Sequence, residues 1–293
     1  MTLVYAVLAV VALASLGVTA LTTFFAMRAA GRNACPESLL RPCRGRRTAC
    51  RMGGIASGIA SQCLMLLTYP LGPVAARFPK KENAPDEAVV VCLHGLYHNA
   101  AAFLALRPVL ARYGMRRVLC LTYRCRGTAF EDVARDLADR LRRSLPADAP
   151  LLLVGHSLGG LLARRLAAMP DIARRVRAVV TLGAPHHGSE LAVLALGRLG
   201  RSLVPESPLF PALDALPDPP RAALLSLASP MDNMVLPLSG LAIDRPAWTQ
   251  EATLPVSHVA MLYHPAILAR VAAFLRVAAG KQGLPDAQRS PGG

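Results

Sequence analysis

The chain of 293 residues is long enough for one large α/β domain with a sizeable core and a smaller additional segment. Its formal net charge of +15 fits either a basic composition overall or attraction to anionic lipid surfaces. Only 5% of the residues are aromatic and no nucleic-acid-binding motif is present, so nucleic acid is excluded as an expected partner.

The first expected element is a long apolar helix. Residues 3–27 contain no charged side chain, and as a helix they extend about 37 Å, enough to cross a hydrocarbon core of about 30 Å. A cleavable signal peptide is the alternative, with Ala12-Leu13-Ala14 as a candidate cleavage site. The length of the run and the absence of a basic residue before it favour an uncleaved anchor. We therefore expect residues 1–27 to be a transmembrane anchor.

Two segments follow the expected anchor. Residues 28–51 contain seven arginines and two prolines, which predicts a solvated or headgroup-facing connector. Within residues 52–86, the stretch 52–76 is uncharged but rich in glycine and serine. It is either a second span or an apolar helix on the membrane or on the catalytic domain. One span places the following domain in the cytoplasm by the positive-inside rule, and two spans place it outside, so the side of the membrane stays open.

From Glu87 onward, strand and helix patterns alternate, which predicts an α/β domain with a mostly parallel sheet and flanking helices over residues 87–280. The expected strands are 88–93, 117–122, 150–154, 176–182 and 222–227. The expected helices are 101–113, 130–145, 161–169 and 265–279. Residues 281–293 are rich in proline, glycine and polar residues and are expected to be a disordered tail.

The hexapeptide Gly155-His156-Ser157-Leu158-Gly159-Gly160 lies between an expected strand and an expected helix. In this context, G-x-S-x-G presents a serine nucleophile on a strained turn, which needs small residues two before and two after the serine. The backbone N–H of Leu158 at the helix start can then bind an oxyanion. The alternative is a tight turn whose serine only caps the helix.

Two further loops are expected at the same edge of the sheet. In His94-Gly95-Leu96-Tyr97-His98-Asn99, the N–H of Leu96 is the expected second oxyanion donor, and Tyr97 is a candidate substrate contact. His94 and His98 have no carboxylate partner nearby in the sequence, so no metal site is expected. After the strand 176–182, His186 and His187 are expected to shape the floor of the substrate pocket.

The three motifs G-H-S-L-G-G, T-L-G-A-P-H-H-G-S and H-G-L-Y-H-N resemble those of the bacterial lipase/esterase branch of the α/β-hydrolase family, over about residues 88–275. The family order of serine, acid and histidine implies Asp232, in S-P-M-D-N-M-V-L-P, as the acid, and His258, in V-S-H-V-A-M-L, as the base. The alternatives for these two roles are Asp214, Asp218, Asp244 and, for the base, His264.

The resemblance implies a serine hydrolase, a lipase or carboxylesterase, that cleaves lipid-like esters through an acyl-enzyme and uses no cofactor. Together with the expected anchor, it implies an enzyme that is associated with a membrane, the inner membrane of a bacterium. The segment 191–216, at the lid position, is short, basic and interrupted by prolines, which argues against large triglycerides as substrates. An acyltransferase on the same triad and a non-catalytic, membrane-tethered binding protein are the alternatives. The oligomeric state stays open. A fragment that starts near Arg77 is expected to be soluble and active.

Overall fold

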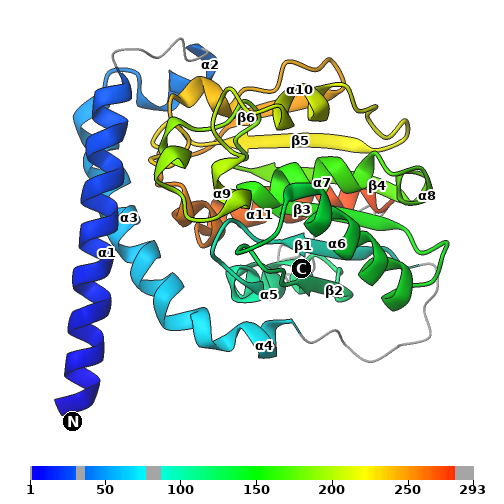
Figure 1. The fold of residues 1–293 in the computed structure, drawn as a ribbon, viewed down its shortest axis with the longest axis horizontal. Helices are drawn as coiled ribbons and strands as arrows, with labels where there is room; N and C mark the ends of the chain where they lie inside the picture. The colour runs from blue at the N-terminus through cyan, green and yellow to red at the C-terminus, as the bar shows by residue number, and fades with distance from the viewer. Residues whose placement is uncertain (1, 31–36, 77–86, 281–293) are drawn as a thin grey trace, which may run out of the picture.

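A computed structural model of the chain describes residues 2–30, 37–76 and 87–280. Its centre is a six-stranded sheet with the strand order β2-β1-β3-β4-β5-β6, in which every neighbouring pair is parallel (Figure 1). The strands are β1 Val89–Leu93, β2 Val118–Leu121, β3 Leu151–His156, β4 Val176–Leu182, β5 Ala223–Ala228 and β6 Trp248–Ala252. The expected parallel sheet is confirmed, and the bounds of the five expected strands differ from those observed by at most two residues.

The sixth strand, β6, was not expected from the sequence. Its five residues, Trp-Thr-Gln-Glu-Ala, contain no apolar run, and only Trp248 among them is buried. A strand needs a continuous apolar sequence only where both of its faces are buried, and the faces of this edge strand are largely uncovered.

Eleven α-helices occur in the described residues, and several are a single turn long. The long ones in the sheet domain are α5 Leu106–Arg112, α6 Phe130–Ser144, α7 Leu158–Ala167 and α11 Pro265–Ala278. The short ones there are α8 Pro170–Ala173, α9 Arg198–Arg201 and α10 Leu209–Asp214. The 3-10 helices there are η4 Ala100–Phe103, η5 Glu190–Leu194, η6 Leu238–Leu241 and η7 Val259–Leu262. The helix expected over 101–113 is therefore split into η4 and α5.

The two faces of the sheet have separate cores. Since successive side chains of a strand point to opposite faces, Val89, Val91 and Leu93 pack with α6 and α7, whereas Val90 and Cys92 pack with α5 and α11. The central strands are buried on both faces, which explains their continuous apolar sequences. This layered arrangement leaves the carboxyl ends of the strands, where the loops of interest begin, free to form a site.

The N-terminal region consists of α1 Thr2–Ala29, α2 Glu37–Leu40, η2 Arg41–Cys43, α3 Arg47–Thr68, η3 Tyr69–Leu71 and α4 Gly72–Ala75. In Figure 1, α1 runs along one side of the molecule, and α3 lies between α1 and the sheet domain. By length and composition, Tyr5–Ala29 and Arg47–Ala75 could each cross a membrane. The side of α1 that faces the protein bears buried Ser15, Thr19 and Thr22.

Most of the other described side chains of α1 from Tyr5 to Met27 are apolar, and many of them are exposed. The exposed side chains are those of Tyr5, Val7, Leu8, Val10, Leu13, Leu16, Val18, Leu21, Phe24 and Met27. The contact between α1 and α3 is close, since a Cβ atom at Gly58 would lie 2.8 Å from Cγ2 of Thr19. Small residues at a helix–helix contact are typical of apolar helices that associate within a bilayer.

Part of the segment 28–51, expected to be a solvated connector, packs on the sheet domain instead. Leu39 is buried in a cluster with Ala228, Val235, Leu238 and Leu241. Helix α3 begins at Arg47, five residues before the apolar stretch that starts at Met52. The composition of the segment alone therefore did not reveal that Leu39 packs on the domain. Residues 31–36, 77–86 and the tail expected over 281–293 lie outside the described residues.

Candidate active site

Ser157 stands on the turn between β3 and α7, since β3 ends at His156 and α7 begins at Leu158. Its backbone angles are φ 54° and ψ −125°, a conformation that residues other than glycine rarely adopt. The N–H of Ser157 donates a hydrogen bond of 2.9 Å to the carbonyl oxygen of Leu182, which ties the turn to the end of β4. A strained serine at a strand-to-helix turn is the geometry of a nucleophile elbow.

The glycines of this turn allow α7 to approach the ends of the strands. A Cβ atom at Gly155 would lie 2.2 Å from the carbonyl oxygen of Gly159. At Gly159, a Cβ atom would lie 2.0 Å from the carbonyl oxygen of Leu93, at the end of β1. No side chain fits at either distance, which confirms the expected need for small residues on both sides of Ser157.

Asp232 and His258 form a buried hydrogen-bonded pair. Asp232 lies on the loop after β5, and His258 directly precedes η7; their exposed fractions are 3% and 2%. Oδ2 of Asp232 is 2.6 Å from Nδ1 of His258, and Oδ1 accepts the backbone N–H groups of Met234 and Val235, both at 2.9 Å. With Nδ1–H donating to the carboxylate, Nε2 of His258 is left as the proton acceptor.

The other candidates for the acid and the base have different neighbours. Asp214 pairs with Arg164 at 2.9 Å, Asp218 pairs with Arg245 at 2.9 Å, and Asp244 lies 3.9 Å from His187. His264 is the N-cap residue of α11. Among the aspartates considered from the sequence, the structure thus brings only Asp232 to His258.

The Asp232–His258 pair lies at the same edge of the sheet as Ser157. His156, the residue before Ser157, has its ring 4.6 Å from the ring of His258, and its Nε2–H donates to the carbonyl oxygen of His258 at 3.1 Å. A Cβ atom at Gly183, directly after β4, would lie 3.1 Å from Nδ1 of His258 and 3.2 Å from Oδ2 of Asp232. His156 was not recognised from the sequence as part of the site, although its place beside Ser157 was a signal.

The two expected oxyanion donors lie on either side of the turn. Leu158 is the first residue of α7, so its N–H has no acceptor within the helix. Leu96 follows Gly95 in the loop after β1, and a Cβ atom at Gly95 would lie 3.1 Å from Cβ of Ser157. The loop that carries Leu96 therefore runs directly against the serine turn.

His94 and His98 are buried in the domain and are not arranged as metal ligands. Nδ1–H of His94 donates to the carbonyl oxygen of Gly95 at 2.8 Å, and Nε2 accepts the N–H of Tyr123 at 3.2 Å. Burial lowers the pKa of His94 to about 3 and that of His98 to about 4, so both are neutral at physiological pH. Within the part of the chain that the structure describes, no three His, Cys, Asp or Glu side chains group together as a metal site.

Tyr97, in the loop after β1, is hydrogen-bonded to the segment 191–216 at the lid position. It has a positive φ of 58°, and its hydroxyl donates to the carbonyl oxygen of Leu196 at 2.5 Å and accepts the N–H of Leu196 at 2.6 Å. The segment that it holds is basic in sequence, but it exposes 68% of Val193, 55% of Leu194 and 61% of Leu196. The lid position is therefore more apolar on its surface than the sequence indicated.

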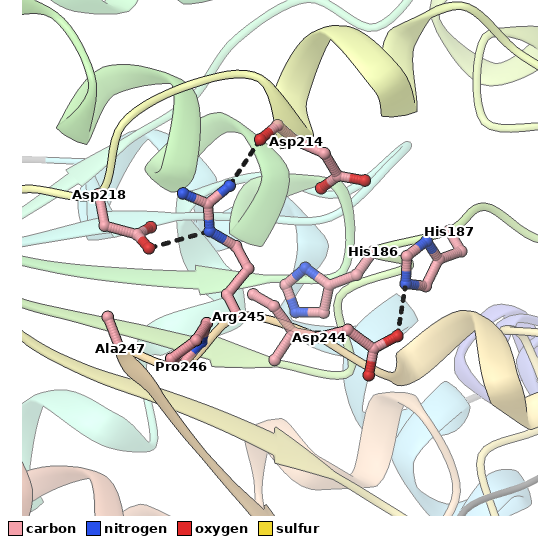
Figure 2. A pocket seen from close by; sticks show the side chains of 9 residues that line it. His186, His187, Asp214, Asp218, Asp244, Arg245, Pro246 and Ala247 are labelled. Atoms are coloured by element: carbon pink, nitrogen blue, oxygen red, sulfur yellow. Dashed lines mark hydrogen bonds and ion pairs between the residues drawn. The ribbon is translucent and has the colours of Figure 1, made fainter.

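His186 and His187, expected to shape the floor of the substrate pocket, line a cavity together. This cavity has a volume of about 510 Å³, and Figure 2 shows His187 turned toward Asp244 beside it. The cavity is also lined by Asp214, Asp218, Ile243, Asp244, Arg245, Pro246 and Ala247. Neither Ser157 nor the Asp232–His258 pair lines it.

His186 is buried among polar side chains of the domain interior. Its exposed fraction is 1%, and its ring nitrogens lie 3.3 Å from Arg164, 3.4 Å from the hydroxyl of Thr181 and 3.3 Å from the hydroxyl of Ser226. Ser226 lies inside β5 and is itself 1% exposed, so this serine–histidine contact is closed to a substrate. A histidine that follows a strand in a motif-like turn can thus be part of the core, which sequence spacing does not distinguish.

Comparison with known proteins agrees with the fold. The model of the alpha/beta hydrolase family matches residues 90–290, and the chain belongs to this family. It is similar to the mature form of the Bacillus licheniformis lipase BlEst2, with a TM-score of 0.52 and 17% identity over 68% of this chain and 95% of that one. It is also similar to Aspergillus fumigatus lipase B, with a TM-score of 0.56 and 15% identity over 75% of this chain and 59% of that one. No curated protein matches the sequence.

Proposed function

We propose that the protein is a serine hydrolase, a lipase or carboxylesterase, that cleaves carboxylic, lipid-like esters through an acyl-enzyme. Ser157 is the nucleophile, His258 the general base and Asp232 the acid of the triad. The proposal rests mainly on the buried Asp232–His258 hydrogen bond of 2.6 Å at the sheet edge that carries the strained serine turn. The two similar proteins named above are lipases, which supports this reaction class.

In the proposed mechanism, Oγ of Ser157 attacks the ester carbonyl while Nε2 of His258 accepts its proton. His258 then gives this proton to the departing alcohol, and the carboxylate of Asp232 stabilises the imidazolium. Water cleaves the acyl-enzyme by the same steps in reverse. The N–H groups of Leu96 and Leu158 bind the oxyanion, and the loss of one such donor typically raises the barrier by about 2.7–4 kcal/mol.

The apolar surfaces support a lipid-like substrate at a membrane. The part of α1 that precedes Ser15 exposes apolar side chains, and a helix that is apolar all round is stable only when it is covered. We propose that α1 anchors the protein in a membrane and that residues 87–280 form the catalytic domain beside it. The exposed Val193, Leu194 and Leu196 are suited to acyl chains near the active-site loops.

A fluorophosphonate probe tests the nucleophile. The full-length protein in detergent is expected to be labelled and to hydrolyse p-nitrophenyl esters, whereas Ser157→Ala should lose both properties. Ser144→Ala, at the exposed end of α6, is the matched control and should behave as wild type. An unlabelled wild-type protein would support the binding-protein alternative. Labelling with acyl transfer to an added alcohol in preference to water would support an acyltransferase.

A further inference from the structure

The loops that carry Asp232 and His258 are in direct contact with α3. The N–H of Ser257 donates to Oγ of Ser57 at 3.0 Å, and the hydroxyls of Ser61 and Ser257 are 3.4 Å apart. A Cβ atom at Gly54 would lie 3.1 Å from Cβ of Met231, the residue before Asp232. The small-residue face of α3 therefore packs on the residues next to both members of the pair.

Asn233 links His258 to α1. Its Nδ2 donates to Oγ1 of Thr22 at 2.6 Å, and its Oδ1 accepts the backbone N–H of His258 at 3.2 Å. The hydroxyl of Thr22 donates its own proton to the carbonyl oxygen of Val18 at 2.9 Å, so it meets Asn233 as an acceptor. Thr22 is 5% exposed and Asn233 is 8% exposed, so water has little access to replace either bond.

These contacts connect a helix at the beginning of the chain to the catalytic residues more than two hundred positions later. Asn233 is adjacent to Asp232 in the chain and is hydrogen-bonded to the backbone of His258, so its orientation affects the positions of both catalytic side chains. If the side chain at position 22 cannot accept this hydrogen bond, a buried amide N–H of Asn233 is left without a partner. Such a loss typically costs about 1–3 kcal/mol and favours another position of the Asn233 side chain. A displacement of about 1 Å at a catalytic group can lower a rate about 100-fold.

We propose that Thr22 and Asn233 are positioning residues for His258, so that the docked N-terminal helix sets the activity of the hydrolase; this rests on the proposed function. The helix α1 is then a structural part of the active site as well as an anchor. A fragment that starts near Arg77, expected from the sequence to be active, should therefore be less active than the full chain, because it lacks every contact of α1 and α3 described above.

The test compares three variants of the full-length protein in detergent, with a short, soluble p-nitrophenyl ester as substrate. Thr22→Val keeps the shape of the side chain and removes the acceptor, and Thr22→Ser restores the hydroxyl. Ser15→Ala is the matched control, because this buried hydroxyl of α1 donates only to the carbonyl oxygen of Val11 in its own helix, at 2.7 Å. Rates are expressed per site titrated with the fluorophosphonate, so that unfolded protein is not counted.

We expect Thr22→Val to lower kcat about 10- to 100-fold with little change in KM, because the ester-binding surface is untouched. Thr22→Ser should recover most of kcat, and Ser15→Ala should resemble wild type. An unchanged kcat per titrated site in Thr22→Val, or an equal loss in Ser15→Ala, would overturn the positioning role while leaving the hydrolase assignment standing. A wild-type protein without labelling or hydrolysis would overturn the proposed function and this inference with it.

Discussion

The substitution Asp232→Asn tests whether the carboxylate of Asp232 controls which nitrogen of His258 carries the proton. In the wild type, Oδ1 accepts two backbone N–H groups at 2.9 Å and Oδ2 accepts Nδ1–H of His258 at 2.6 Å. The asparagine oxygen can keep both backbone bonds, and its NH₂ group then faces Nδ1. Because an NH₂ group only donates, Nδ1 must become the acceptor and the imidazole proton moves to Nε2.

An imidazole protonated at Nε2 cannot accept the proton of Ser157. The reverse orientation of the asparagine would point its NH₂ group at two backbone donors and leave them unpaired, at about 1–3 kcal/mol each, so it is disfavoured. The same exchange in a serine protease triad lowers kcat about 10⁴-fold. This corresponds to about 5.5 kcal/mol of barrier, and we expect a loss of that order here.

The assay is the kcat for a p-nitrophenyl ester, measured with the full-length protein, together with the thermal midpoint. Asp232→Asn should keep a midpoint close to that of wild type, because the two backbone hydrogen bonds survive. Asp244→Asn is the control, since the Asp244 side chain is 89% exposed and 3.9 Å from His187. The reasoning is refuted if Asp232→Asn retains kcat within about ten-fold of wild type, well short of the loss expected for the wrong tautomer.

Three other outcomes are expected. Gly159→Ala should lower the free energy of unfolding by about 3 kcal/mol or more in denaturant titrations, because its Cβ would lie 2.0 Å from the carbonyl oxygen of Leu93. Gly17→Ala, with no atom within 4 Å, is its control. The free energy of unfolding should decrease as the pH is lowered below about 6.5, by up to about 1.4 kcal/mol per pH unit for each buried histidine. The reason is that these histidines bind protons in the unfolded chain and exclude them in the folded one. Burial lowers the pKa of each of these histidines in the folded state: His94, His98, His156 and His186. A denaturation midpoint that is constant from pH 8 to 5 would contradict this. The full-length protein should stay with membranes through high-salt and carbonate washes; release by salt alone, or a mature form starting near Ser15, would argue against the anchor.

The sheet and the serine turn could be predicted because their signals are local. Buried parallel strands need continuous apolar residues, and the close approach of α7 to the strand ends requires glycine at Gly155 and Gly159. The edge strand β6 was missed because its largely uncovered faces impose no such pattern. The assignment of Asp232 over Asp214, Asp218 and Asp244 came from the family order. In the structure Asp232 lies 2.6 Å from His258, whereas the other three aspartates lie beside Arg164, Arg245 and His187.

By itself, the sequence determined the fold class, the positions of five of the strands along the chain, the position of the strained serine and the apolar character of the N-terminal helix. These depend on residue types at short spacing, which chain geometry converts directly into strands, turns and helices. Only the tertiary structure decided that His186 is buried against Arg164 and Ser226, that His156 contacts His258, and that Asn233 joins His258 to Thr22. A hydrogen bond between residues two hundred positions apart has no signature along the chain, because its partners become neighbours only after the sheet and the helices have packed.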